Sequence, residues 1–216
     1  MRGDSIVIEP HHKRAAEGIC KIILPSLRER DDRFVLTVAG ESGSGKSETA
    51  AAVAEQLAQS GIQSYIFQQD DYFVYPPKSN DQARRKDINW VGPNEVKLDL
   101  LDEHLNAFRN GAKSVKKPLV VYADDSVEEE LAEFGDAQVA IAEGTYTTLL
   151  NQVNAHAFID RDFEQTRAHR EKRRRDAAEL DPFIDKVLTI EHDIISKNKS
   201  RADIIVHDDY SVSPAN

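Results

Sequence analysis

Short apolar runs alternate with longer amphipathic segments along most of the chain. The runs are short enough, and several are rich enough in Val, Ile and Leu, to form strands that are buried on both faces. We predict strands at residues 33–39, 62–67, 118–122, 137–143, 156–160 and 202–206. Apolar residues recur at helical spacing between them, which predicts helices at 10–24, from the glycines after residue 39 to Gly61, from Pro93 to Gly111, at about 163–178 and at 183–199. This alternation predicts an α/β fold with a mostly parallel sheet flanked by helices.

The segments outside this alternation are predicted to be irregular. Pro25 is expected to break or kink the first helix. Residues 68–92 are polar and are predicted to form a long loop, and the acidic segment 124–136 is expected at the surface. Because no linker divides the chain, residues 1–216 are predicted to form a single domain, with residues 1–32 as an N-terminal helical extension.

A complete phosphate-loop motif stands between the first predicted strand and the helix that follows it. The pattern G-x-x-x-x-G-K-[ST] is filled by Gly40, Glu41, Ser42, Gly43, Ser44, Gly45, Lys46 and Ser47. Its glycines allow backbone N–H groups to turn toward phosphate oxygens, and the helix N-terminus adds partial positive charge. We expect catalytic Lys46 to reach the β- and γ-phosphates and the Ser47 hydroxyl to coordinate Mg²⁺. With Thr49 as a further nucleotide contact, the motif predicts a P-loop NTPase fold that binds a nucleoside triphosphate with Mg²⁺, and we expect ATP as that nucleotide.

Carboxylates follow two of the predicted strands. Asp70 and Asp71 come just after the second strand, and Glu143 ends the strand at 137–143. Ligands of open α/β sheets bind beyond the carboxyl ends of the strands. Asp70 could therefore take the proton of an attacking hydroxyl or hold Mg²⁺, and Glu143 could complete the metal site; the alternative is solvated acids. Tyr72 beside them could contact the substrate that carries the attacking hydroxyl, or it could simply pack against the rest of the protein and hold the loop in place.

A dense basic segment follows in a chain whose formal net charge is −10. Arg167, Arg170 and Arg174 share one helical face, which favours phosphate binding over an ordinary solvated face. We predict that Arg167 contacts ATP, that Arg170 and Arg174 are catalytic, and that Arg174 also contacts the acceptor. These residues are expected to belong to a helical lid at about 163–185.

Charge and composition limit the partners. An acidic protein with a pI near 5.2 repels nucleic acid and anionic membrane, so neither is expected as a partner. No run approaches the ~20 apolar residues of a membrane helix. Cys20 is the only cysteine, which excludes an intrachain disulfide and fits a cytoplasmic protein. Self-association stays open, and a homo-oligomer is compatible with the sequence.

Several motifs together resemble the uridine kinase family, within the wider group that includes phosphoribulokinase and bacterial pantothenate kinase. The segments that carry this resemblance are AGESGSGKSETAA, FQQDDYF, WVGPNEVKLDLL, KPLVVY, VAIAEGTY, FIDRDFEQTRAHREKRRRD and RADIIV. The resemblance implies a kinase that phosphorylates a hydroxyl group of a small molecule. It implies Asp70 as the base, Glu143 in the metal site, and Asn94 and Tyr122 as contacts of the acceptor.

The sequence departs from that family where the acceptor is chosen. Gly92, Pro93 and Asn94 stand where a nucleoside kinase has His-Pro-Asp, and the segment after Tyr122 lacks the expected aromatic and His positions. Uridine or cytidine is the first hypothesis for the acceptor. The alternatives are a sugar or pantothenate-like alcohol, a nucleoside monophosphate, or an ATP-binding module without catalysis. A GTPase is disfavoured because residues 198–201 lack the aspartate of N-K-x-D.

Overall fold

The computed structural model describes residues 6–166 and 181–215. The predicted basic helix lies mostly outside this part of the chain, and so do Arg167, Arg170 and Arg174; residues 163–166 form a turn. Within the two described ranges, no helix is both long and apolar enough to cross a lipid bilayer.

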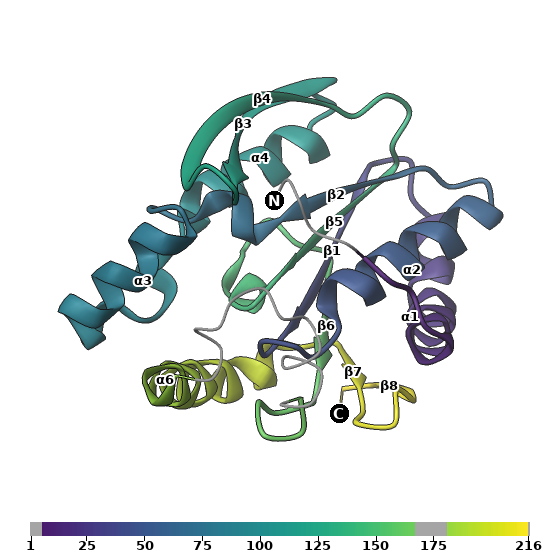
Figure 1. Ribbon diagram of the computed structural model, residues 1–216. Coiled ribbons are helices and arrows are strands. Elements are labelled where there is room, and N and C mark those ends of the chain that lie inside the picture. The colour runs from purple at the N-terminus through teal and green to yellow at the C-terminus, as the bar shows by residue number, and fades with distance from the viewer. Residues whose placement is uncertain (1–5, 167–180, 216) are drawn as a thin grey trace.

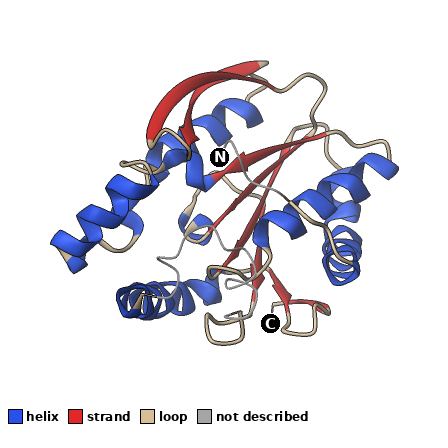
Figure 2. Ribbon diagram, viewed as in Figure 1, coloured by secondary structure: helices blue, strands red, loops and turns tan. Residues whose placement is uncertain are grey.

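A twisted six-stranded sheet forms the centre of the molecule (Figures 1 and 2). Its order is β2-β5-β1-β6-β7-β8, and all neighbouring pairs are parallel except β7 and β8. The strands are β1 (Phe34–Gly40), β2 (Ser64–Gln68), β5 (Val139–Gly144), β6 (Ala155–Ile159), β7 (Ile204–Val206) and β8 (Val212–Pro214). Every residue of β1 is buried, as expected for an apolar run at the centre of a parallel sheet. The predicted α/β architecture is confirmed.

The sheet separates two hydrophobic cores because neighbouring side chains of a strand point to opposite faces. In β1, Leu36 and Val38 enter one core, whereas Val35 and Ala39 enter the other. The first core is covered by α1 and α2, and the second by α4 and α6 (Figure 1). The helices are α1 (Pro10–Arg28), α2 (Lys46–Gln59), α3 (Pro77–Lys86), α4 (Leu98–Arg109) and α6 (Pro182–Asn198).

A separate antiparallel hairpin crosses above β2 in Figure 1. It consists of β3 (Ser114–Val121) and β4 (Ser126–Glu133). The acidic segment 124–136 is therefore mostly a strand, which the sequence prediction missed. Glutamates have low strand propensity, but β4 is an edge strand whose outer positions are exposed, and charges are common there.

The predicted long loop 68–92 contains α3. This helix has no apolar face, so hydrophobic periodicity could not indicate it. Its first turn is instead capped by Asp125 of the hairpin turn, whose carboxylate accepts from the Lys78 and Ser79 backbone N–H groups at 2.7 and 3.1 Å. The hairpin turn and the start of α3 are thus joined.

Two helix boundaries also differ from the prediction. α1 continues through Pro25 to Arg28, because Leu27 beyond the proline still packs on the first core. α4 begins at Leu98, since the segment from Pro93 forms a separate 3₁₀ turn. Within α1, Cys20 faces the core, and burial raises the pKa of its thiol to about 12.

Candidate active site

The phosphate loop connects the end of β1 to the start of α2. Gly43 and Gly45 have φ angles of 77° and 89°, a left-handed conformation that residues with a Cβ rarely adopt. Lys46 is the first residue of α2, and its Nζ donates to the Glu41 carbonyl at 2.9 Å. The loop therefore has the strand–turn–helix context that the motif requires. The Lys46 side chain turns back onto the loop and contacts its backbone at Glu41.

Oxygen ligands converge beside this loop. β5 lies between β1 and β2, and its register places Glu143 level with Val38 and Gln68. The Ser47 hydroxyl donates to Glu143 Oε1 at 3.1 Å. Burial, reinforced by the negative charge of Asp70, raises the pKa of Glu143 to about 7, against the lowering effects of Lys46 and Ser47. One hydroxyl and two mutually repelling carboxylates are a donor set that fits Mg²⁺.

The two neighbouring aspartates have different surroundings. Asp71 is 2% exposed. It accepts from Lys117 Nζ at 2.7 Å and from the Val120 N–H at 3.1 Å, so it fastens the hairpin to the end of β2. Asp70 is half-buried in the 3₁₀ turn Gln69–Tyr72, on the side of Glu143.

The structure corrects the expectation for Tyr72. Its side chain is fully buried in the second core, and its hydroxyl bonds His104 Nδ1 at 2.8 Å. It has no exposed surface that an acceptor could contact. Asn94 is exposed on the 3₁₀ turn Pro93–Glu95, and Tyr122 is half-buried at the hairpin turn. Thr49 is fully buried behind the loop.

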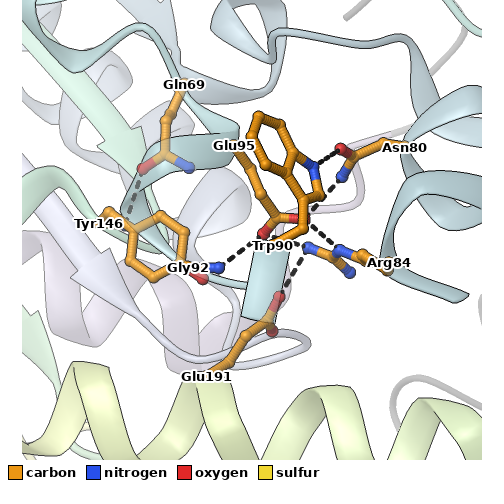
Figure 3. Close-up of polar contacts among 8 residues, drawn as sticks. All are labelled: Gln69, Asn80, Arg84, Trp90, Gly92, Glu95, Tyr146 and Glu191. Carbon is orange, nitrogen blue, oxygen red and sulfur yellow. Dashed lines mark hydrogen bonds and ion pairs between the residues drawn. The ribbon is translucent and has the colours of Figure 1, made fainter. Parts of the chain in front are cut away.

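A buried ionic cluster that the sequence did not indicate joins α3, the turn Pro93–Glu95 and α6 (Figure 3). Arg84 of α3 donates from Nε and Nη2 to both oxygens of Glu95, and Nη2 also donates to Glu191 of α6 at 3.0 Å. Glu95 is fully buried, whereas the Arg84 side chain is 16% exposed. Burial raises the pKa of Glu191, although the charge of Arg84 opposes this effect. The cluster binds three separate elements together.

Further polar contacts fix this cluster in place. Asn80 Nδ2 donates to Glu95 Oε1 at 2.9 Å, and the Gly92 N–H donates to Glu95 Oε2 at 3.0 Å. Trp90 Nε1 donates to Asn80 Oδ1 at 2.9 Å. Glu95 therefore holds the start of the segment Gly92–Asn94, which stands where nucleoside kinases have His-Pro-Asp, through its hydrogen bond with the Gly92 N–H. A sequence pattern cannot distinguish such a buried glutamate from a surface one.

The buried side chain of Gln69 fixes the turn after β5. This buried side chain accepts from the Tyr146 N–H at 2.7 Å (Figure 3). It lies so close to Gly144 that a Cβ there would be 2.3 Å from the Gln69 Cβ. The glycine after Glu143 is thus required for packing, and the contact sets the direction in which the chain leaves the end of β5.

A cavity of about 280 Å³ opens beside the phosphate loop at the carboxyl ends of β6 and β7. Glu41 lies on its wall and accepts from His192 Nδ1 at 2.6 Å and from the Phe163 N–H at 2.7 Å. The other lining residues are Phe158, Asp160, Arg161, Asp162, Gln165, Ser196, Lys199, His207 and Asp208. The Glu41 side chain therefore links the phosphate loop to α6 and to the segment that precedes Arg167.

The fold and this site define a class of protein. A strand, a glycine-rich loop with a terminal lysine, and a hydroxyl with two carboxylates meet at the carboxyl edge of a parallel sheet. That combination is found in P-loop nucleotide-binding proteins of the kinase type.

Comparison with known proteins identifies the family. The chain belongs to the Phosphoribulokinase / Uridine kinase family, which it matches over residues 35–208. It is 28% identical over 194 residues to the bifunctional alpha-galactosidase/sucrose kinase AgaSK of Mediterraneibacter gnavus, covering 84% of this chain and 21% of that protein. It is 32% identical over 132 residues to a uridine kinase of Mannheimia succiniciproducens, covering 59% of this chain and 61% of that one. The matches thus span less than two thirds of both relatives.

The fold is shared with more distant proteins. The D-glycerate 3-kinase of Cryptococcus neoformans superposes with a TM-score of 0.62 at 10% identity, over 93% of this chain and 99% of that one. At this identity the similarity concerns the fold alone.

Proposed function

We propose that this protein is an ATP-dependent kinase that transfers the γ-phosphate to a hydroxyl group of an uncharged polyhydroxyl compound, such as a sugar. Membership of the family and the complete phosphate loop support phosphoryl transfer. The cavity beside Glu41 offers room for part of the nucleoside of ATP.

Each side chain of the site has a proposed task. The loop N–H groups and Lys46 hold the β- and γ-phosphates, and Asp70 takes the proton of the attacking hydroxyl. Ser47, Asp70 and Glu143 would hold Mg²⁺, which neutralises phosphate charge when it is bound. Arg167, Arg170 and Arg174 are proposed to neutralise the remaining charge from the lid.

We place the acceptor beside α3 and the β3–β4 hairpin, and the charge balance there is the observation that carries the choice of acceptor. Arg84 lies between Glu95 and Glu191, and Lys117 lies between Asp71 and Glu130 at 2.7 Å from each. Each buried cation is thus already matched by two carboxylates. Such surroundings disfavour an acceptor that carries a carboxylate or a phosphate, because its charge would meet excess negative charge.

Uridine or cytidine remains the second candidate. The matches to uridine kinases favour it, and a nucleoside is also an uncharged polyhydroxyl compound. The exposed Asn94 and the replacement of His-Pro-Asp weaken the case for a ribose grip. The match to a protein named as a sucrose kinase supports a sugar instead.

The test is a side-by-side measurement of kcat/KM by ADP release. The acceptors are fructose, glucose, sucrose, uridine, cytidine, D-glycerate, pantothenate and a nucleoside monophosphate. We expect a sugar to give the highest value and the anionic compounds to give background rates. A preference for D-glycerate, pantothenate or the monophosphate would contradict the charge argument, and a preference for uridine or cytidine would select the second candidate.

A further inference from the structure

Two segments of this chain lie outside the region that matches the family, yet both reach the phosphate loop. They are α1 and residues 209–214, which we call the flanking brace. The two parts pack on each other: a Cβ on Gly18 of α1 would be 2.6 Å from the Val212 Cβ. The rings of His11 and Tyr210 lie 4.3 Å apart.

The brace contacts the rear of the loop at Ser44 and Gly45. The Tyr210 hydroxyl donates to the Ser44 carbonyl at 3.3 Å. A Cβ on Gly45 would lie 2.9 Å from His12 Nε2 and 3.1 Å from the Tyr210 hydroxyl oxygen. Two buried side chains of the brace therefore lie directly against this peptide.

The hydroxyl of Tyr210 is oriented by its own partners. Arg161 Nη1 donates to it at 2.6 Å, which leaves the hydroxyl proton free to point at the Ser44 carbonyl. Tyr210 has a φ of 62°, a left-handed conformation that is uncommon for a residue with a side chain. The surrounding contacts thus maintain a strained backbone that aims this ring at the loop.

His12 is oriented by the start of its helix. Its Nδ1 accepts from the Glu9 backbone N–H at 3.0 Å, so a neutral ring carries its proton on Nε2 and donates to His11 Nε2 at 3.1 Å. Glu9, His11 and His12 are close enough to hold a metal ion. The protonated Nε2 opposes that use, and we interpret the group as a hydrogen-bonded pair that fixes the His12 ring beside Gly45.

We infer that Tyr210 and His12 are positioning residues for nucleotide binding, an inference that rests on the proposed function. The Ser44 carbonyl and the Gly45 N–H belong to one planar trans peptide, so they point in opposite directions. Holding the carbonyl toward the brace aims the Gly45 N–H into the phosphate cradle. Fixing this direction before ATP arrives reduces the ordering required on binding. The nucleotide site of this chain therefore extends beyond the family region.

The test compares Tyr210→Phe, which removes only the hydroxyl, with Val212→Ala, which loosens the same brace without contacting the loop. Binding of Mg²⁺ and a non-hydrolysable ATP analogue is measured by calorimetry, with thermal unfolding in parallel. Loss of one hydrogen bond should raise the Kd of Tyr210→Phe, and its KM for ATP, by roughly 3- to 10-fold. The KM for the acceptor should stay unchanged, and Val212→Ala should lower Tm but keep the wild-type Kd.

Three outcomes would overturn the inference. Tyr210→Phe could bind the analogue as the wild type does, which would leave its hydroxyl without a role in binding. Val212→Ala could weaken binding equally, which would indicate general loosening. If the unaltered protein bound no nucleotide at all, the proposed function would fail together with this inference, and that result is distinguishable from the first two.

Discussion

Lys46 lies at the start of α2 with its Nζ on the Glu41 carbonyl, outside both hydrophobic cores. Lys46→Ala should therefore leave the fold intact. It should remove the positive charge that stabilises the γ-phosphate during its transfer. We expect turnover to fall by roughly 10²–10³-fold or more, as when another charge-stabilising donor is lost. Steady-state kinetics and thermal unfolding measure the two effects, with exposed Lys86→Ala as the control. Near-normal turnover in Lys46→Ala would refute the proposed chemistry.

Asp70 and Asp71 are adjacent, but we expect opposite consequences from their substitution. Asp70→Asn should lower kcat by ~10²–10⁴-fold, because the acceptor hydroxyl loses its base, and at saturating Mg²⁺ this loss should far exceed any weakening of ATP binding. Asp71→Asn should mainly lower stability, because it removes a charge that pairs with buried Lys117. Kinetics and denaturant unfolding of both variants separate these effects. A larger kcat loss in Asp71→Asn at unchanged stability would move the base by one residue.

Glu143 provides a metal-dependent test at the same site. Glu143→Gln keeps the size of the side chain but removes one of the two carboxylate charges that we assign to Mg²⁺. The Mg²⁺ concentration for half-maximal activity should rise by about tenfold or more, and saturating Mg²⁺ should restore part of the rate. Glu133→Gln, on the exposed face of β4, is the control. An unchanged Mg²⁺ requirement would remove Glu143 from the metal site.

Among the elements, α3 depends on polar contacts that come from distant parts of the chain. Arg84→Ala would leave Glu95 and Glu191 buried without their cation, which typically destabilises a fold by about 3–5 kcal/mol. Arg85→Ala is a matched control one residue away, since the ion pairs of Arg85 with Asp81 and Asp181 are largely exposed and its guanidinium otherwise lies over the Phe183 ring, so that its loss should have a far smaller effect. Denaturant unfolding measures both variants. Equal, small losses would show that the cluster contributes little to stability.

The loss of folding stability caused by Arg84→Ala should also depend on pH. Burial raises the pKa of Glu191 in the folded state, and losing Arg84 removes an opposing effect. An acid whose pKa is raised by folding binds more protons in the folded state, so stability falls as pH rises above the unfolded pKa of ~4.3. The deficit should therefore be smaller at pH 5 than at pH 8. A deficit that grows on acidification would contradict the assignment of Glu191.

The elements that could be predicted from the sequence are those whose stability follows from local pattern. β1, the phosphate loop and α2 have apolar runs, glycines and helical periodicity, and all three were predicted correctly. By contrast, α3 is stabilised by a cap from Asp125, which is far away in the sequence. The burial of Tyr72 depends likewise on His104 of α4. Local pattern carries no information about partners that only the tertiary fold brings together.

For the whole molecule, the prediction concerns closure around ATP. The segment that we expect to form the lid is attached at both described ends. Thr166 donates to the Ser42 carbonyl of the phosphate loop at 2.9 Å, and Asp181 pairs with Arg85 of α3 at 2.8 Å. Binding of an ATP analogue should slow hydrogen exchange across residues 163–185. Unchanged exchange there, with protection at the phosphate loop, would argue against a lid.

The buried position of Cys20 has a practical consequence for following that motion. A thiolate is the reactive form of cysteine, and burial raises the pKa of this thiol to about 12. Maleimide reagents should therefore not react with Cys20 in the folded protein, and no cysteine needs to be removed before labelling. A cysteine introduced at exposed Glu164 would carry a fluorophore as the single label. The natural chain is thus ready for stopped-flow or single-molecule observation of nucleotide-driven movement, free of background labelling.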